Sequence, residues 1–233
     1  MALGWRDLRS LLARSVLGQD CVLCAAASGE RLLCAACAAD LPQTAEACPR
    51  CAGPSPGGAV CGACIAHPPH FDATFAPWRY EFPVDRLVLA LKFGRRLALA
   101  EAFGAALADR AAGRRVDALV PMPLGPARLV ERGFNQALEI ARHLARATGL
   151  PLAPELARRV RDTAPQTDLP HDARAANVRG AFECGLGIAG RTLAVVDDVM
   201  TTGASLEELA RTLKRAGAER VENWVVARTW PRS

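Results

Sequence analysis

Four Cys-x-x-Cys pairs within the first 64 residues restrict what this chain can fold into more than any other feature of its sequence. Two cysteines at this spacing lie on one tight turn and can bind a single ion, and two such turns complete a tetrahedral four-cysteine zinc site. Nine, ten and nine residues separate successive pairs, so the pattern is duplicated. We therefore expect two structural zinc sites with no open position for a catalytic water. The predicted ligands are Cys21, Cys24, Cys34, Cys37, Cys48, Cys51, Cys61 and Cys64.

Other chemistries fit the same cysteine pattern less well. An iron–sulfur site and a relay of redox dithiols are the competing interpretations. Zinc is favoured because one such pair could be chance or a redox motif, but four evenly spaced pairs could hardly be. The segment is poor in apolar bulk, so the metal is expected to have a structural role and to supply the folding free energy that a core would otherwise provide. In a sequential arrangement the first two pairs hold one ion and the last two hold the other, while an interleaved arrangement stays open. The ninth cysteine, Cys184, is expected to be a small buried residue.

The rest of the chain differs in character from the cysteine region. We expect residues 1–66 to form an N-terminal helix and a double zinc ribbon, and residues 71–233 to form a larger α/β domain. From residue 116 onward, short apolar runs alternate with amphipathic segments, which is typical of a parallel sheet flanked by helices. The predicted strands are 116–121, 152–156, 192–197 and 221–227, and the predicted helices are 3–17, 84–110, 131–148 and 204–216.

Two further segments of this region have less regular patterns. Residues 71–82 are rich in aromatic side chains and are interpreted as a strand pair or an extended cover. Residues 158–180 are polar and have no period, which is typical of a functional or mobile loop.

Charge and hydropathy limit the compartment and the partners of the chain. No run of 18 apolar residues occurs, which excludes a membrane-spanning helix. Charged residues from Arg6 to Arg14 interrupt the stretch in which a signal peptide needs an apolar segment, so we expect a cytoplasmic protein. The 29 basic and 24 acidic residues give a net charge of +5. This surplus permits binding to phosphates or nucleic acid without requiring it.

Two acids and a hydroxyl-rich turn follow the strand predicted at 192–197. Backbone N–H groups at a helix N-terminus favour an anion, and a glycine in the turn lets the backbone approach a phosphate closely. Acids at the carboxyl end of a parallel strand can accept hydrogen bonds from the hydroxyls of a ribose. The plain alternative is a strand followed by a capped helix, which needs only one such side chain. The acids are Asp197 and Asp198, and the turn residues are Val199, Met200, Thr201, Thr202, Gly203, Ala204 and Ser205.

These residues closely resemble the phosphoribosyl pyrophosphate motif of the type I phosphoribosyltransferases. A second set resembles the ComF family of competence-related proteins, which also carries the double zinc ribbon, so that the resemblance covers essentially the whole chain. It includes the helix residues 89–93, residues 120–124 and 131–136, Arg128, Arg159, Arg161, Thr163, Gln166, Arg174, Asn177, Val178 and residues 180–182. The resemblance implies a type I phosphoribosyltransferase fold for residues 71–233, preceded by the small zinc-ribbon domain.

The resemblance also implies roles for individual residues. Asp197 and Asp198 would be the catalytic acids, and residues 199–205 would bind phosphoribosyl pyrophosphate together with Mg²⁺. Arg128 and Arg132 would bind the diphosphate, although Arg132 could instead pair with Glu131 on the surface. Further ligand contacts are expected from Lys92 and, in the loop at 158–180, from Arg174.

The favoured interpretation is a protein that binds phosphoribosyl pyrophosphate and assists DNA uptake with single-stranded DNA. Its partners would include a DNA-uptake helicase or a recombination mediator. The alternative is an active Mg²⁺-dependent phosphoribosyltransferase that acts on a nucleobase or a related small acceptor. Phe71, Phe75, Trp78 and Tyr80 could stack on bases, but packing inside the fold is the more expected role for this cluster.

Overall fold

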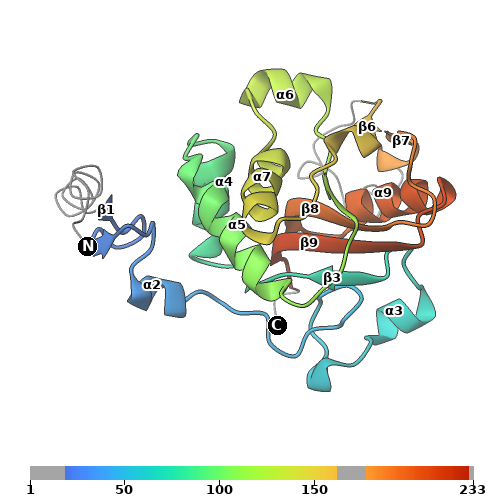
Figure 1. Cartoon of the computed structure of the whole chain (residues 1–233). Coiled ribbons are helices and arrows are strands. Elements are labelled where there is room, and N and C mark those ends of the chain that lie inside the picture. The colour runs from blue at the N-terminus through green and yellow to red at the C-terminus, as the bar shows by residue number, and fades with distance from the viewer. Residues whose placement is uncertain (1–18, 162–176, 231–233) are drawn as a thin grey trace, which may run out of the picture. The chain divides into compact units, whose positions relative to one another are not determined.

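The structure of the chain is a computed structural model, and it describes residues 19–161 and 177–230. By their contacts the residues fall into two units, Met1–Pro42 and Gln43–Ser233 (Figure 1). We call these the N-terminal unit and the sheet unit. The division lies inside the predicted double ribbon, because the last four ribbon cysteines belong to the sheet unit. The domain ranges 1–66 and 71–233 follow motifs rather than contacts and stay a prediction, and the helix expected at 3–17 lies outside the described residues.

The N-terminal unit is built from two short strands and one short helix. β1 (Gln19–Asp20) pairs antiparallel with β2 (Ala27–Gly29), and α2 (Ala35–Ala39) follows. The thiol of Cys34 caps α2 by accepting a hydrogen bond from the amide of Cys37. Among the described residues of this unit, α2 contains no buried side chain. The buried residues among the described part of this unit are Cys21 and Leu41, so its folding is expected to depend on bound metal rather than on an apolar core.

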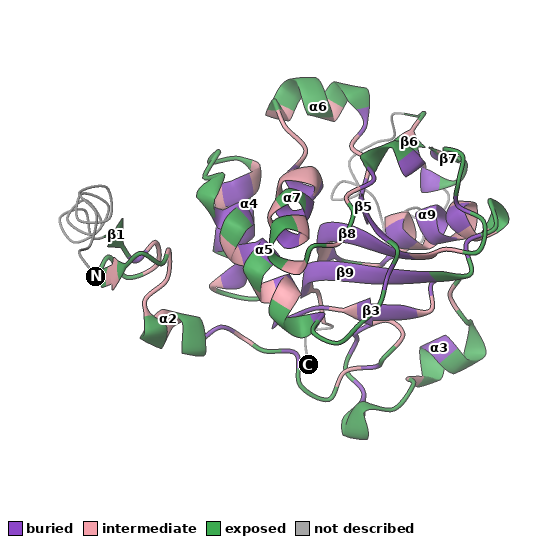
Figure 2. Cartoon of the chain, viewed as in Figure 1, coloured by how far each residue is buried: buried purple, intermediate pink, exposed green. Residues whose placement is uncertain are grey.

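A parallel sheet forms the centre of the sheet unit (Figure 1). Its strands are β3 (Ala73–Phe75), β9 (Arg220–Arg228), β8 (Thr192–Met200) and β5 (Ala118–Pro121) in that order, and β4 (Trp78–Arg79) also pairs with β9. β8 and β9 are buried along almost their whole length (Figure 2). Because both faces of such strands are covered, even the polar residues Glu222 and Asn223 of β9 are buried.

Helices pack on the sheet and cover the side chains of its strands. α5 (Ala98–Arg110) and α7 (Gln136–Thr148) pack against each other and on the sheet, and α9 (Ala204–Arg215) packs on β9. Leu193 and Val195 share one buried cluster with Leu206 and Leu209 of α9. The two acids Asp197 and Asp198 lie near the carboxyl end of β8, and both are buried.

Three predicted strands are confirmed as β5, β8 and β9, while the strand at 152–156 is wrong. That segment makes a single bridge, between Leu152 and Leu119, and then forms the 3-10 turn η2 (Pro154–Leu156). Pro154 fixes its own φ near the helical value and has no N–H to donate to a strand, so it favours a turn at this place. The segment 71–82 forms β3 and β4, which both pair with β9.

Two predicted helices have different bounds in the structure. The helix expected at 84–110 is two helices, α4 (Val84–Lys92) and α5, because Arg95 between them has a φ of 51°. The helix expected at 131–148 is α7, which begins where the side chain of Asn135 accepts hydrogen bonds from two backbone amides. The short helix α6 (Pro126–Arg132) precedes it and ends at Gly133, whose φ is 81°.

Two short paired strands lie at the two ends of the segment 158–180, which was predicted to be a loop. β6 (Ala157–Arg159) pairs antiparallel with β7 (Phe182–Cys184), and most of the chain between them lies outside the described residues. Cys184 lies half-buried against the apolar core, and this burial raises the pKa of its thiol to about 11. A thiol with so high a pKa is inert as a nucleophile. None of the described helices is both long enough and apolar enough to cross a membrane.

Candidate functional site

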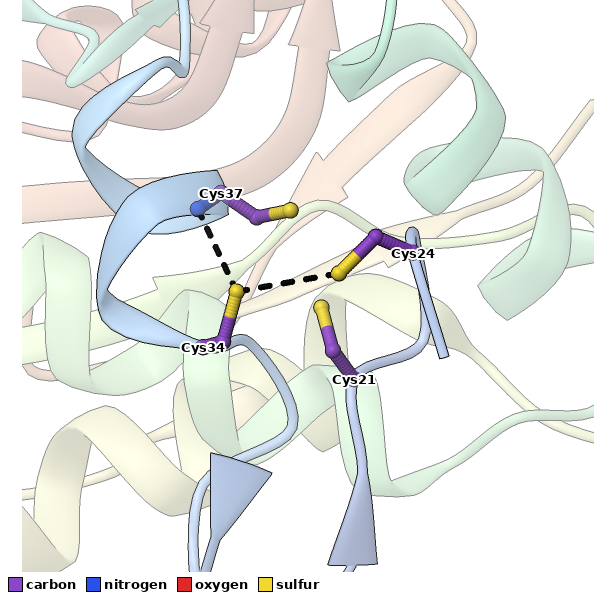
Figure 3. Close-up of side chains that lie close together, drawn as sticks. All are labelled: Cys21, Cys24, Cys34 and Cys37. Carbon is purple, nitrogen blue, oxygen red and sulfur yellow. Dashed lines mark hydrogen bonds between the residues drawn. The ribbon is translucent and has the colours of Figure 1, made fainter. Parts of the chain in front are cut away.

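The eight ribbon cysteines form two groups of four, and each group fits a zinc ion. In each group the four Sγ atoms lie within 4.8 Å of one another. The Sγ atoms of Cys24 and Cys34 are 3.8 Å apart, and those of Cys51 and Cys61 are 3.7 Å apart. A tetrahedron with zinc–sulfur bonds of about 2.3 Å has edges of about 3.8 Å. In Figure 3 the four thiols of the first group point toward one another.

The grouping follows the order of the sequence. The first two pairs form one group, which comprises residues 21, 24, 34 and 37, and the last two pairs form the other, which comprises residues 48, 51, 61 and 64. Backbone amides support the thiolates: the amide of Cys37 donates to Cys34 Sγ at 3.4 Å, and that of Cys61 donates to Cys48 Sγ at 3.3 Å. Burial raises the pKa of Cys48, but hydrogen bonds from backbone amides outweigh it and lower this pKa to about 7. The sequential arrangement is therefore confirmed over the interleaved one.

We expect metal analysis of the purified protein to find two zinc ions per chain, because both groups of thiols have tetrahedral spacing. A Cys24→Ser variant and a Cys61→Ser variant should each keep about one ion, since each removes a ligand from a different group. Elemental analysis by mass spectrometry measures this directly. One zinc per wild-type chain, or iron in its place, would contradict the assignment.

The second cysteine group is built into the sheet unit. The backbone amide of Thr74 in β3 donates to the carbonyl of Pro49 at 3.1 Å. Ala52, which follows Cys51, is buried in the same apolar cluster as Leu193 and Val195 of β8. The hydroxyl of Thr44 donates to the carbonyl of Ala76. This ribbon segment therefore shares the core of the sheet.

Asp198 and Lys92 form a buried ion pair at the carboxyl end of β8. Lys92 Nζ, at the end of α4, lies 2.5 Å from Asp198 Oδ2, and Asp198 is only 3 % exposed. Burial raises the pKa of Asp198, but the charge of Lys92 and the hydrogen bonds that Asp198 accepts together lower this pKa below its usual value. Burial likewise lowers the pKa of Lys92, but the charge of Asp198, its hydrogen bond and the charge of Asp197 together raise this pKa. The pair therefore keeps Asp198 ionised, while a direct contact of Lys92 with a ligand stays a prediction.

Asp197 lies in a different electrostatic environment from its neighbour. Burial, followed by the charge of Asp198, raises the pKa of Asp197 well above its ordinary value. Its Oδ1 accepts a hydrogen bond from the amide of Asp198 at 2.8 Å. The pKa values of these two adjacent carboxyls are thus shifted in opposite directions, and Asp197 is the one that can hold or release a proton.

We expect Asp197→Asn to raise the melting temperature of the ligand-free protein by about 2–4 °C, the shift that about 1 kcal/mol gives in a domain of this size. The amide oxygen can still accept from the Asp198 amide, but the buried charge is removed. Because the folded-state pKa of Asp197 is raised, wild-type stability falls as pH rises above the ordinary carboxyl range, and the variant lacks this fall.

The difference in melting temperature between variant and wild type should therefore widen from about pH 5 to about pH 8. Melting curves over this series measure it, with Asp109→Asn at an exposed position of α5 as the control that should not shift. A variant that melts below the wild type at every pH would contradict the prediction.

The turn between β8 and α9 has the open geometry of an anion site. Gly203 occupies the N-cap of α9 with a φ of 84°, and it has no side chain of its own to cap the helix. The hydroxyl of Thr202 accepts from the amide of Ala204 at 3.3 Å, while Thr201 is exposed. Met200 differs from its neighbours, because its side chain is buried in the apolar core beneath the turn. Only its backbone can face a ligand.

The two arginines of α6, Arg128 and Arg132, differ in their surroundings. Arg132 Cζ lies 5.2 Å from the ring centre of Phe93, and its guanidinium donates to Gln136 Oε1 at 2.5 Å. Burial lowers the pKa of Arg132, and the charges of Asp198 and Asp197 act against this, so its guanidinium lies within their field. The hydrogen-bond partner of Arg132 is thus Gln136, while the charge of Glu131 also raises the pKa of Arg132. Within the described residues, Arg128 Nη2 is buried and has no hydrogen-bond partner. Arg174 lies outside the described residues.

Two family models match the chain in its two parts. A double zinc ribbon domain matches residues 12–65, and a phosphoribosyl transferase domain matches residues 145–229. The DNA utilization protein YhgH of Salmonella typhimurium is 35 % identical over 205 residues, which cover 84 % of this chain and 90 % of that protein. Competence protein F of Haemophilus influenzae is 34 % identical over 115 residues, which cover 48 % of this chain and 50 % of that protein.

The chain belongs to the ComF family. A further ComF-type relative, the DNA utilization protein YhgH of Escherichia coli, is 34 % identical over 172 residues, which cover 71 % of this chain and 76 % of that protein. The parallel sheet with flanking helices and the matched transferase domain confirm the predicted fold class of this ComF protein, and the two groups of four cysteines confirm its zinc-ribbon region.

Phe71 and Trp78 of this ComF protein are packed inside the fold, while Phe75 and Tyr80 are partly exposed. Phe71 and Trp78 are 4 % and 8 % exposed. The Trp78 ring meets Phe103 edge-on with centres 6.0 Å apart, and Phe75 meets Trp224 in the same way at 6.5 Å. The predicted packing role is therefore supported over base stacking.

Two polar residues near the site of the ComF chain were missed by sequence reasoning. Glu208 of α9 accepts from the amide of Gly180 at 2.7 Å and from Arg211 Nε at 3.0 Å, which ties the end of the irregular segment to α9. The spacing of three residues between Glu208 and Arg211 on a predicted helix is the sequence signal that could have found this pair. Arg228 ends β9 beside the end of β8. An arginine at the carboxyl end of a predicted parallel strand is the signal that could have found it.

Proposed function

We propose that this ComF-family protein binds phosphoribosyl pyrophosphate with Mg²⁺ at the carboxyl end of β8. The observation that carries the proposal is a buried acid pair, Asp197 and Asp198, followed by a turn in which Gly203 is the N-cap of α9 with a φ of 84°. The turn and the first amides of α9 would hold the 5-phosphate, because such amides favour an anion. The two acids would accept hydrogen bonds from the ribose hydroxyls.

Arginines of α6 are the candidates for holding the diphosphate. Arg128 Nη2 is buried and has no hydrogen-bond partner in the described part of the chain, and a bound anion would satisfy this donor. Arg132 lies in the field of the same acid pair and can supply a second positive charge. Mg²⁺, when bound, neutralises part of the remaining diphosphate charge through oxygen ligands. Residues 199–205, Arg128 and Arg132 thus form the proposed binding set, together with the predicted Lys92 and Arg174.

The biological role that we propose is the handling of single-stranded DNA during DNA uptake, with a DNA-uptake helicase or a recombination mediator as partner. Relatives with the names DNA utilization protein and Competence protein F support this role. The net charge of +5 suits a polyanionic partner. Phe82 and Phe93 are 76 % and 68 % exposed, and they offer rings on which bases could stack.

A second candidate function is phosphoribosyl transfer, and the raised pKa of Asp197 is the observation that favours it. In that reaction a nitrogen of the acceptor forms a bond to C1 of the ribose, and the bond from C1 to the diphosphate breaks. Asp197 would accept the proton that the acceptor nitrogen loses, because a carboxyl with a raised pKa is suited to that task.

Titration calorimetry with phosphoribosyl pyrophosphate and Mg²⁺ tests the proposed site. We expect the wild type to bind and Asp198→Asn to bind more weakly by about 1–3 kcal/mol, the usual cost of a lost charge-assisted hydrogen bond. Asp109→Asn, exposed on α5, is the matched control and should bind like the wild type. Absence of binding to the wild type would refute the proposal.

Product analysis then separates binding from transfer. The protein is incubated with phosphoribosyl pyrophosphate, Mg²⁺ and a pool of nucleobases and nucleic acids, and the products are identified by mass spectrometry. A new nucleotide together with free diphosphate would establish transfer. Bound but unchanged phosphoribosyl pyrophosphate would support the binding function.

A further inference from the structure

Arg228 joins the second cysteine group to the turn that follows β8. Its Nε donates to the carbonyl of Cys51 at 2.9 Å. Its Nη1 donates to the carbonyls of Met200 at 3.0 Å and of Thr229 at 2.8 Å, and also to that of Thr201. One guanidinium therefore holds a zinc-ligand residue and the first residues of the proposed phosphate turn in fixed positions.

A second side chain reinforces this connection. Trp230 Nε1 donates to the carbonyl of Ala52 at 2.9 Å, and the guanidinium of Arg79 lies 5.6 Å from the Trp230 ring. Ala52 has a φ of 52°, which a non-glycine residue adopts only where its surroundings hold it. The Cys51–Ala52 turn is thus held by two side chains from the end of β9 and the residues after it.

The first cysteine group provides a natural comparison. Its four cysteines lie in the N-terminal unit, which the contacts of the chain separate from the sheet unit. Arg228, Met200 and the second cysteine group all lie in the sheet unit. The two zinc sites thus have the same ligands but different surroundings, and they can be tested against each other.

We infer that the second four-cysteine site is part of the ligand-binding machinery and that Arg228 is the positioning residue that couples its zinc to the turn at 200–205. This inference rests on the proposed binding of phosphoribosyl pyrophosphate. Zinc fixes the turn that carries Cys51, and the Cys51 carbonyl then fixes Arg228. Arg228 in turn holds the carbonyls of Met200 and Thr201, so the amides that follow them face the 5-phosphate in one arrangement. The first four-cysteine site is expected to play no part in this.

Four variants test the coupling by zinc content and by calorimetry with phosphoribosyl pyrophosphate and Mg²⁺. Cys61→Ser should lose one zinc and bind at least about tenfold more weakly, which corresponds to about 1.4 kcal/mol. Cys34→Ser should also lose one zinc but keep the wild-type affinity. Arg228→Lys should keep both zinc ions and still bind at least about tenfold more weakly, because an ammonium cannot reproduce the fork of the guanidinium. Arg220→Gln, at the other end of β9, should behave like the wild type.

Amide hydrogen exchange provides a readout that does not depend on the ligand. Exchange at residues 200–206 should be faster in Cys61→Ser and Arg228→Lys than in the wild type, and unchanged in Cys34→Ser. If Cys61→Ser fails to fold, Arg228→Lys still decides, since it retains all eight cysteines. Wild-type exchange and affinity in Arg228→Lys would overturn the inference, and so would equal losses of affinity in Cys34→Ser and Cys61→Ser. A wild type that does not bind the ligand would refute the proposed function, while the exchange rates would still test the coupling.

Discussion

Gly203→Val should weaken the binding of phosphoribosyl pyrophosphate at least about 100-fold, or about 2.7 kcal/mol. Gly203 has a φ of 84°, where a β-branched side chain is strained. A Cβ built there would lie 2.5 Å from Met200 Cε, so the turn or the buried Met200 side chain must move. A movement of the turn displaces the amides at the start of α9, which are the proposed donors to the phosphate.

Calorimetry with phosphoribosyl pyrophosphate and Mg²⁺ measures this loss, and Gly113→Val is the matched control. Gly113 has a φ of 80° with no atom within 4 Å of an added Cβ, and it lies in the turn after α5. It should therefore show the backbone strain, as a lower melting temperature, without the loss of affinity. Unchanged affinity in Gly203→Val would exclude the turn at 199–205 as the phosphate site.

The parts of the site that could be predicted from sequence are those built from neighbouring residues. The cysteine groups depend on turns of four residues, and the acid pair with its turn is contiguous from Asp197 to Ser205. In both cases local geometry specifies the chemistry, because a tight turn or a strand end fixes where the side chains point. The sequence leaves the pairing of the four cysteine pairs open, and the structure shows that neighbouring pairs share a site.

The parts that could not be predicted depend on contacts between distant residues. The Arg228–Cys51 hydrogen bond joins positions 177 residues apart. Lys92 reads in the sequence as a basic residue in the last turn of a helix, and its burial against Asp198 depends on how α4 packs beside β8. The periodicity of 84–110 continues through Gly94 and Arg95, yet the backbone breaks there because Arg95 has a positive φ. The spacing of apolar residues alone does not reveal such a break between two helices.

Trp78→Ala should lower the free energy of unfolding by about 3–5 kcal/mol, the usual cost of removing a buried tryptophan. Trp78 is 8 % exposed, its ring contacts Phe103, and its strand pairs with β9 at Ala227. The substitution leaves a cavity in the packed cluster of aromatic residues beside the sheet. It removes no exposed ring and no charge, so the affinity for single-stranded DNA and its dependence on salt should not change.

Urea denaturation, paired with filter binding of single-stranded DNA over a salt series, separates packing from stacking. Phe93→Ala is the comparison, because Phe93 is 68 % exposed beside Arg132 and has little packing to lose. If bases stack on the exposed ring, Phe93→Ala should weaken DNA binding by about 1–3 kcal/mol with little change in stability. The opposite pattern, in which Trp78→Ala weakens DNA binding while unfolding is unaffected, would show that Trp78 leaves the core to meet a base. That result would also identify residues 71–80 as part of the surface that binds single-stranded DNA.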